Sequence, residues 1–133
     1  MKVGFVGCGE MGEPMAGHVL KSGKFEVWVF DIRKAASKAI ARRGAKVAGS
    51  LEELGRQCDV IVVMVGYDHQ VRQVVTDLAR IGKKGAVIVI TATTHPDVRR
   101  ISSASSLIRL SLEMCFESRM PLSAQDSTTP WFT

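Results

Sequence analysis

The sequence predicts an α/β domain, a doubly wound parallel sheet of about five strands with helices on both faces. Short apolar runs alternate with stretches of helical periodicity along most of the chain. This alternation is typical of parallel strands that are joined by right-handed helical crossovers. In addition, two of the apolar runs are continuous and rich in β-branched residues, which indicates strands that are covered on both faces.

Five segments are expected to form the strands. The two continuous runs, DVIVVMV and AVIVI, occupy residues 59–65 and 86–90. Three further segments with strand-like composition precede them, at residues 2–6, 25–30 and 45–48. In the usual order of such a sheet, 3-2-1-4-5, the first and fourth strands are neighbours, and a ligand lies over their carboxyl ends.

Helical patterns separate these segments. The clearest is a stripe of Val and Leu between residues 71 and 78, at the i, i+3, i+4 and i+7 spacing of one helix face. Ser50 and Glu53 form a capping box, which marks the start of a further helix. Two smaller stripes complete the set: Met11, Met15 and Val19, and Ala35, Ala36, Ala39 and Ile40.

After Pro96 the chain changes character. The spacing of apolar residues between 98 and 112 allows one more helix. From 101 to 133, however, there is no glycine and no lysine, and eleven of the 33 residues are Ser or Thr. We therefore expect a folded domain over residues 1–112 and an irregular, poorly ordered tail over residues 113–133.

Composition and charge argue against several classes of partner. The formal net charge is +5 and 6% of the residues are aromatic, whereas a nucleic-acid groove usually shows a basic stripe with interleaved aromatics. No apolar run reaches the length of a membrane span. The three cysteines are odd in number and lack metal-ligand spacing, which favours a reduced compartment. We expect a cytoplasmic protein, with an organellar protein without its presequence as the alternative, and we expect no metal site and no nucleic-acid or membrane partner.

Gly7, Gly9 and Gly12 form a G-x-G-x-x-G motif between the first predicted strand and the first predicted helix. Gly7 lets the chain turn tightly, Gly9 lets the backbone approach a pyrophosphate, and Gly12 lets helix and strand pack closely. The start of the helix then offers N–H groups and a positive dipole end to the phosphates. The motif predicts a dinucleotide site, and a purely structural tight turn remains the alternative.

Asp31 ends the second predicted strand, 19 positions after Gly12. A carboxylate at this place can accept both hydroxyls of the adenosine ribose, and it favours NAD because it repels the 2′-phosphate of NADP. Arg33 leaves NADP open as a second cofactor, since its guanidinium could meet that phosphate. The alternative for Asp31 is that it caps the following helix.

Two further loops follow the fourth and fifth predicted strands. Val65 and Gly66 are expected opposite the glycine loop, because the first and fourth strands are neighbours. Thr91, Thr93 and His95 are expected further along the same crevice, where the nicotinamide would reach. A threonine hydroxyl there could bond the carboxamide, and an ordinary polar loop is the alternative.

Four segments together resemble the β-hydroxyacid dehydrogenase family, which includes 3-hydroxyisobutyrate dehydrogenase, tartronate semialdehyde reductase and 6-phosphogluconate dehydrogenase. They are GFVGCGEMGEPMAGHVLKSG, VFD, CDVIVVMVG and GAVIVITATTHP, and they cover about residues 1–100 in order. The resemblance implies a Rossmann domain that binds NAD or NADP and takes part in hydride transfer between the nicotinamide and a small 3-hydroxy acid. In complete members an all-helical domain follows, which supplies substrate contacts and dimerisation.

By this resemblance, several positions are expected to contact the cofactor. The glycine loop, the ribose position, the loop after the fourth strand and the threonine of a D-x-S-T-x-x-P segment all have counterparts. These residues are Gly7, Gly9, Glu10, Met11, Gly12, Asp31, Val65, Gly66 and Thr93.

The chain departs from the family where catalysis is concerned. Ile90 and Ala92 stand where the family has an aspartate and a serine, and RMPLSAQ at 119–125 is a poor counterpart of its substrate-binding D-A-P-V-S-G-G segment. The family's catalytic lysine has no counterpart, and Lys2 and Lys84 fall at the amino end of the predicted sheet. We assign no catalytic residue and expect a truncated, inactive chain that takes substrate only if the helical domain is supplied.

Two alternatives to a dehydrogenase domain are kept. One is a non-catalytic dinucleotide-binding or interaction module, which would bind cofactor without turnover. The other is an imine reductase or pyrroline-carboxylate reductase type, which shares the G-x-G-x-M-G opening. The segment TATTHP favours the hydroxyacid family over this second alternative.

Overall fold

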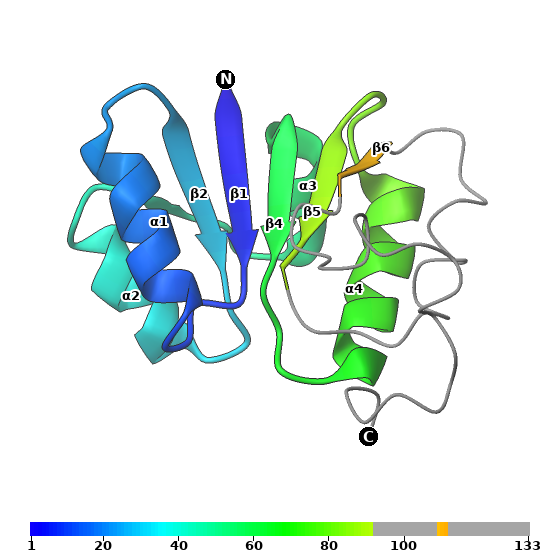
Figure 1. Ribbon diagram of the computed structural model, residues 1–133, viewed down its shortest axis with the longest axis horizontal. Coiled ribbons are helices and arrows are strands. Elements are labelled where there is room, and N and C mark those ends of the chain that lie inside the picture. The colour runs from blue at the N-terminus through cyan, green and yellow to red at the C-terminus, as the bar shows by residue number, and fades with distance from the viewer. Residues whose placement is uncertain (92–108, 112–133) are drawn as a thin grey trace, which may run out of the picture.

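The fold is seen in a computed structural model that describes residues 1–91 and 109–111. These residues form a six-stranded, all-parallel sheet with the order β3-β2-β1-β4-β5-β6 (Figure 1). The strands are β1 (Lys2–Val6), β2 (Glu26–Phe30), β3 (Lys46–Val47), β4 (Val60–Val63), β5 (Val87–Ile90) and β6 (Arg109–Ser111). The helices are α1 (Gly12–Lys21), α2 (Lys34–Ala41), α3 (Leu51–Gln57) and α4 (Asp68–Ile81).

The predicted fold class is confirmed, including the order 3-2-1-4-5 of the first five strands. The prediction was wrong at residues 109–111, which fall in the fifth helix that the sequence allowed and instead form strand β6 beside β5. Pairing along the free edge of β5 satisfies backbone groups there, and local helical periodicity carries no information about that edge. The rest of the expected helix and the tail at 113–133 lie outside the described residues, so the domain boundary stays a prediction.

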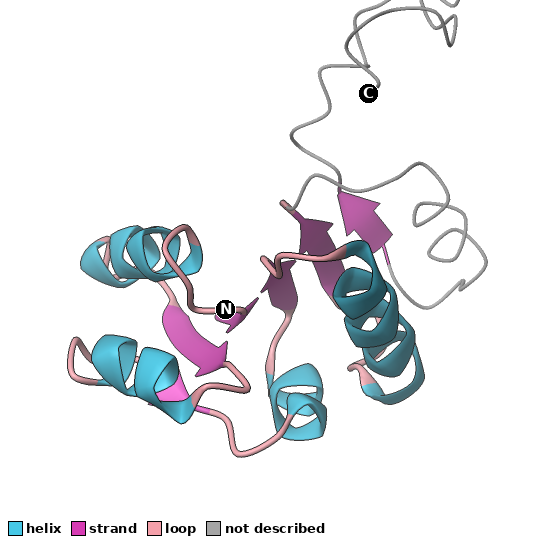
Figure 2. Ribbon diagram, turned by 90° about the horizontal axis from the view of Figure 1, so that it is seen from below, coloured by secondary structure: helices cyan, strands magenta, loops and turns pink. Residues whose placement is uncertain are grey.

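Helices cover the sheet on both sides (Figure 2). Helices α1 and α2 pack on one face, where Phe5 and Val29 join Ala16 and Ile40 in a buried cluster. Helices α3 and α4 pack on the other face against side chains such as Ile61, together with Val63, Ile88 and Ile90. Alternate residues of the middle strands therefore point into two separate cores, which explains why β4 and β5 are continuously apolar.

Both strong helix signals in the sequence have their predicted outcome. Ser50 is the N-cap of α3, and its side chain accepts a hydrogen bond from the Glu53 amide at 3.1 Å. The Glu53 carboxylate in turn accepts from the Gly49 amide at 2.7 Å. On α4 the stripe turns its Val71, Val75 and Leu78 into the core. None of the helices in the described part of the chain combines the length and apolarity needed to cross a membrane.

Candidate functional site: the carboxyl edge of the sheet

The glycine loop lies at the carboxyl edge of the sheet, where β1 and β4 are neighbours and the strand order reverses. Hydrogen bonds carry the strand pairing into the loops at this edge. The Gly7 amide donates to Phe30 O at 3.0 Å, the Met64 amide to Val6 O at 2.8 Å and the Thr91 amide to Val63 O at 3.2 Å. The loops after β1, β4 and β5 are therefore held side by side, as predicted for a ligand crevice at a topological switch point.

Two of the three motif glycines are required by the protein itself. Gly7 has a φ of +93°, and a Cβ at this position would collide with the carbonyl oxygen of Met64. A Cβ on Gly12 would collide with the carbonyl oxygen of Gly7. The turn out of β1 and the close approach of α1 therefore account for these two residues without any ligand.

Gly9 differs from the other two glycines. A Cβ built there would approach only the guanidinium of Arg33, at 3.5 Å, which is an ordinary contact distance. The backbone N–H groups of residues 9–12 meet no acceptor within the described residues, and Met11 gives α1 no side-chain cap. Room for a Cβ without a clash thus lies beside a row of N–H donors at a helix start, which is the arrangement that binds a phosphate.

Asp31 lies immediately beside the glycine loop. Its carboxylate Oδ2 accepts a hydrogen bond from the Cys8 amide at 2.7 Å, and Oδ1 accepts from the Arg33 amide at 2.8 Å. The Asp31 side chain is 9% exposed, whereas that of Arg33 is 72% exposed with its Nε 3.6 Å from Oδ1. Asp31 is not the N-cap of α2: that position belongs to Arg33, whose side chain makes no capping bond.

The other predicted contact residues lie around this loop. Glu10 and Met11 are exposed at its tip. Val65 is half-buried, with a methyl group 3.3 Å from where a Cβ of Gly7 would lie, and Gly66 is exposed with nothing near it. Thr93 and His95 lie outside the described residues. These assignments of cofactor contacts stay predictions, although the structure gathers the described ones at one edge.

The Thr91 hydroxyl lies at this edge but is engaged within the protein. It lies 3.3 Å from Val63 O and 3.2 Å from Met64 Sδ. A threonine in this position therefore fixes the loop after β5 to the end of β4, which is a structural use of the side chain.

The sequence did not predict the role of Cys8. This residue is buried, and its backbone amide donates the hydrogen bond to the Asp31 carboxylate. The spacing of the motif gives no signal for this contact, because position 8 is one of the variable positions. Burial, followed by the charge of Asp31, raises the pKa of the Cys8 thiol to about 12. The thiol is therefore protonated at neutral pH and is a poor nucleophile.

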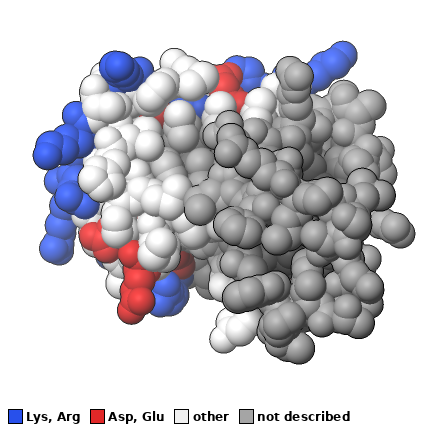
Figure 3. Space-filling view, in the orientation of Figure 1, with Lys and Arg blue, Asp and Glu red and all other residues white. Residues whose placement is uncertain are grey.

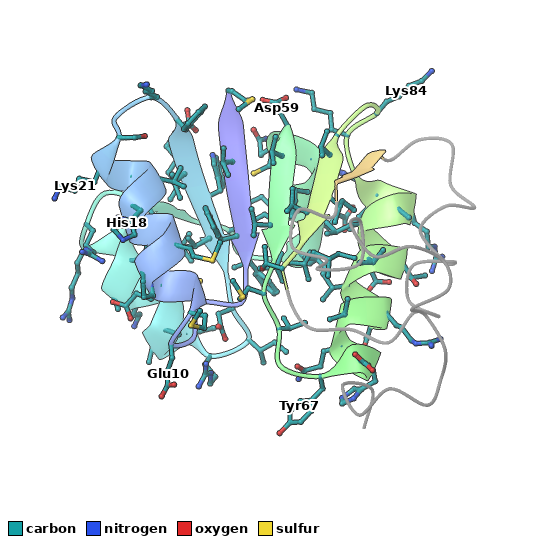
Figure 4. All side chains as sticks on the ribbon, in the orientation of Figure 1. Glu10, His18, Lys21, Asp59, Tyr67 and Lys84 are labelled. Carbon is teal, nitrogen blue, oxygen red and sulfur yellow. The ribbon has the colours of Figure 1, made fainter. Side chains whose placement is uncertain are left out.

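The charge around the loop is mixed. In Figure 3 a group of acidic side chains lies at the lower left, the end of the molecule where Figure 4 labels Glu10. Glu13 lies in the first turn of α1, where its charge suits the helix dipole. Acidic groups and Arg33 thus flank the same row of N–H donors, and they would act on a bound phosphate with opposite signs.

Lys2 and Lys84 lie at the amino edge of the sheet, as predicted, and Lys83 lies there with them. Lys2 Nζ donates to Gln57 Oε1 at 2.9 Å, and Lys83 Nζ pairs with Asp59 Oδ1 at 2.6 Å. Figure 4 shows Lys84 and Asp59 at the end opposite to Glu10 and Tyr67. These lysines therefore lie at the edge of the sheet opposite to the glycine loop.

Comparison with known proteins adds independent observations. Residues 2–109 match the family described as the NAD binding domain of 6-phosphogluconate dehydrogenase. The chain is 33% identical over 131 residues to a 3-hydroxyisobutyrate dehydrogenase-like protein of Arabidopsis thaliana, covering 94% of this chain and 37% of that protein. It is 32% identical over 97 residues to the mitochondrial 3-hydroxyisobutyrate dehydrogenase of Drosophila melanogaster, covering 72% of this chain and 30% of that protein.

Solved structures agree with these matches. The 3-hydroxyisobutyrate dehydrogenase of Salmonella typhimurium aligns with a TM-score of 0.75 at 29% identity, over 83% of this chain and 40% of that one. An imine reductase of Myxococcus stipitatus in complex with NADP⁺ aligns with a TM-score of 0.74 at 23% identity, over 83% of this chain and 39% of that one. At that identity the second likeness shows the fold alone. The chain spans well under half the length of each of these four proteins.

Proposed function

The chain belongs to the family of NAD-binding domains described for 6-phosphogluconate dehydrogenase, and on that premise we propose that it binds NAD as the cofactor domain of a 3-hydroxyisobutyrate dehydrogenase-like oxidoreductase. The reaction would be hydride transfer between the nicotinamide and a small 3-hydroxy acid. The relatives that carry such names match this chain at 32–33% identity. Imine reductases share the fold, and their lower identity does not favour their chemistry here.

The observation that carries the proposal is that Gly9 has room for a Cβ, with only the side-chain end of Arg33 at contact distance among the described residues. Apart from its chain neighbours, no backbone atom of the described residues lies within 4 Å of the place of its missing Cβ, so the described fold gives no steric reason for a glycine there. The reason is instead supplied by a ligand that must approach the main chain closely. The N–H groups of residues 9–12 and the start of α1 suit the two charges of a pyrophosphate in that position.

The preference for NAD over NADP rests on Asp31. Its carboxylate lies beside the loop and keeps acceptor capacity on both oxygens, which suits the two hydroxyls of an adenosine ribose. A 2′-phosphate in the same place would meet this negative charge. The exposed guanidinium of Arg33 would partly offset that repulsion, so the preference is expected to be moderate.

In this proposal the described residues bind and orient the cofactor, and the nicotinamide supplies the hydride chemistry when bound. The glycine loop would fix the pyrophosphate, Asp31 the ribose, and Val65 and Gly66 the wall opposite the loop. Substrate contacts and the proton-transferring lysine implied by the family resemblance would come from a helical domain outside the described residues. The cytoplasmic location stays a prediction, since the named relatives above include mitochondrial proteins.

Calorimetric titration of the chain with NADH and with NADPH tests the proposal. We expect both to bind, with NADH the tighter, and no binding of either would overturn it. Turnover of NAD⁺ with 3-hydroxyisobutyrate is a separate measurement. Binding without turnover by this chain fits both a cofactor domain that needs its helical partner and a non-catalytic module, and adding the helical domain of a relative distinguishes the two.

A further inference from the structure

We propose that Asp31 is a positioning residue for the glycine loop, in addition to its proposed contact with the ribose. Its carboxylate would hold the loop in the shape that presents the N–H groups of residues 9–12 to the pyrophosphate. The functional meaning of this inference rests on the proposed dinucleotide site. The structural part concerns the chain without any ligand and can be tested there.

Two successive amides attach the loop to the end of β2. The Gly7 amide binds the carbonyl oxygen of Phe30, which extends the backbone pairing of β1 with β2 by one residue. The next amide, that of Cys8, binds the Asp31 carboxylate instead, at 2.7 Å. Beyond Cys8, the N–H groups up to Gly12 have no acceptor in the described part of the chain. Asp31 is therefore the last attachment before the row of free donors.

The attachment has the properties of a strong hydrogen bond. A carboxylate accepting from a backbone amide at this distance forms a charge-assisted bond, which is shorter and stronger than a bond between neutral groups. The Asp31 side chain is 9% exposed and Cys8 is buried, so water competes poorly for either partner. The other oxygen of Asp31 holds the Arg33 amide, which fixes the orientation of the carboxylate itself.

The loop needs such an attachment because of its composition. Glycines at positions 7, 9 and 12 give the loop more conformational freedom than other residues would, and that freedom must be lost when a ligand binds. A loop that is already fixed at Cys8 loses less conformational entropy when a ligand binds. Asp31 would then contribute to pyrophosphate affinity without touching the pyrophosphate.

Amide hydrogen exchange in the ligand-free chain tests the positioning directly. In the variant Asp31→Ala we expect the exchange rate of the Cys8 amide, followed by NMR, to rise at least tenfold. The rate of the Val29 amide in β2 should stay within twofold, which would show that the core is intact. Asp68→Ala, at an exposed acidic residue of the same edge, is the matched control and should leave the Cys8 rate unchanged.

An unchanged Cys8 rate in Asp31→Ala would overturn the inference. If Asp31→Ala does not fold, Asp31→Asn decides instead. The two amides bind different carboxylate oxygens, and asparagine replaces one of these oxygens by an NH₂ group, which is a donor. We then expect the amide of Cys8 or that of Arg33 to exchange faster than in wild type. Unchanged exchange rates at both amides would contradict the inference.

A ligand without an adenosine ribose separates positioning from ribose contact. Reduced nicotinamide mononucleotide carries a phosphate but no adenosine. We expect Asp31→Ala to weaken its binding at least threefold, while a residue that acts only on the ribose would leave it unchanged. If wild type binds neither this ligand nor NADH, the proposed function fails, and the exchange experiment still decides whether Asp31 positions the loop.

Discussion

The two edges of the same parallel sheet are built in opposite ways. At the amino edge, charged groups satisfy one another: Asp59 pairs with Lys83 at 2.6 Å and accepts from the Lys2 amide at 3.0 Å. Glu26 similarly holds Lys46 at 2.9 Å. At the carboxyl edge, the N–H donors of residues 9–12 have no acceptor among the described residues, and Gly9 beside them has room for a Cβ.

The difference separates stability from binding within one fold. Ion pairs and backbone bonds at the amino edge engage Asp59 and Glu26 with groups of the protein itself. The carboxyl edge keeps donors at a helix start, where a phosphate can take them. We therefore expect substitutions at the amino edge to change stability alone, and substitutions at the carboxyl edge to change binding.

The largest expected effect on stability is at Gly7, in the loop at the carboxyl edge. Gly7→Ala would combine a positive φ with a collision against Met64 O, so we expect a loss of more than about 3 kcal/mol in the free energy of unfolding. Urea denaturation measures it. Gly85→Ala is the matched control, because Gly85 has a φ of +83° but nothing within 4 Å. Its expected cost is about 1 kcal/mol, and an equal cost for both variants would contradict the account.

The next effect in size concerns cofactor discrimination at the carboxyl edge. Arg33→Gln removes the exposed cation beside Asp31 and Gly9 while keeping the amide that Asp31 binds. We expect NADPH affinity to fall about fivefold and NADH affinity to change less than about twofold, since the guanidinium would meet only the 2′-phosphate. Parallel calorimetric titrations measure both. Equal losses for the two cofactors would show that Arg33 does not discriminate between them.

A smaller effect tests the amino edge. The backbone amide of Lys2 and then the side chain of Lys83 lower the pKa of Asp59. Because the folded pKa lies below the unfolded one, the carboxylate stabilises the fold above the unfolded pKa, and this contribution is lost as pH falls through the folded pKa. Asp59→Asn should lower the melting temperature slightly at pH 7, with a gap to wild type that closes in acid. NADH affinity should not change, and a change would break the separation of the two edges.

The smallest effect concerns the exposed charge at the tip of the loop. Glu10→Gln removes a negative charge near the proposed phosphate position, so NADH should bind about twofold tighter at low salt. The gain should disappear at high ionic strength, because exposed charges are screened there. Titrations at two salt concentrations check this, and a gain that survives high salt would point to a direct contact instead.

The sequence predicted the features that depend on local pattern. The alternation of strands and helices followed from the alternating periods, the strand order from the usual order of such a sheet, and the structural reasons for Gly7 and Gly12 from the geometry of the motif. The contact of Cys8 with Asp31 was not predictable, because it joins residues 23 positions apart through a backbone amide that every residue type except proline carries. Strand β6 was missed for a similar reason, since pairing with β5 outweighed the helical spacing of that segment.

The most direct test of the account is the pair of wild type and Gly9→Ala, titrated with NADH and unfolded in urea under the same conditions. Among the described residues, a methyl group at Gly9 meets only the flexible end of Arg33, so the free energy of unfolding should change by less than about 0.5 kcal/mol. The account predicts that wild type binds NADH and that Gly9→Ala binds at least tenfold more weakly at this unchanged stability. Equal NADH affinity in the two proteins would contradict it.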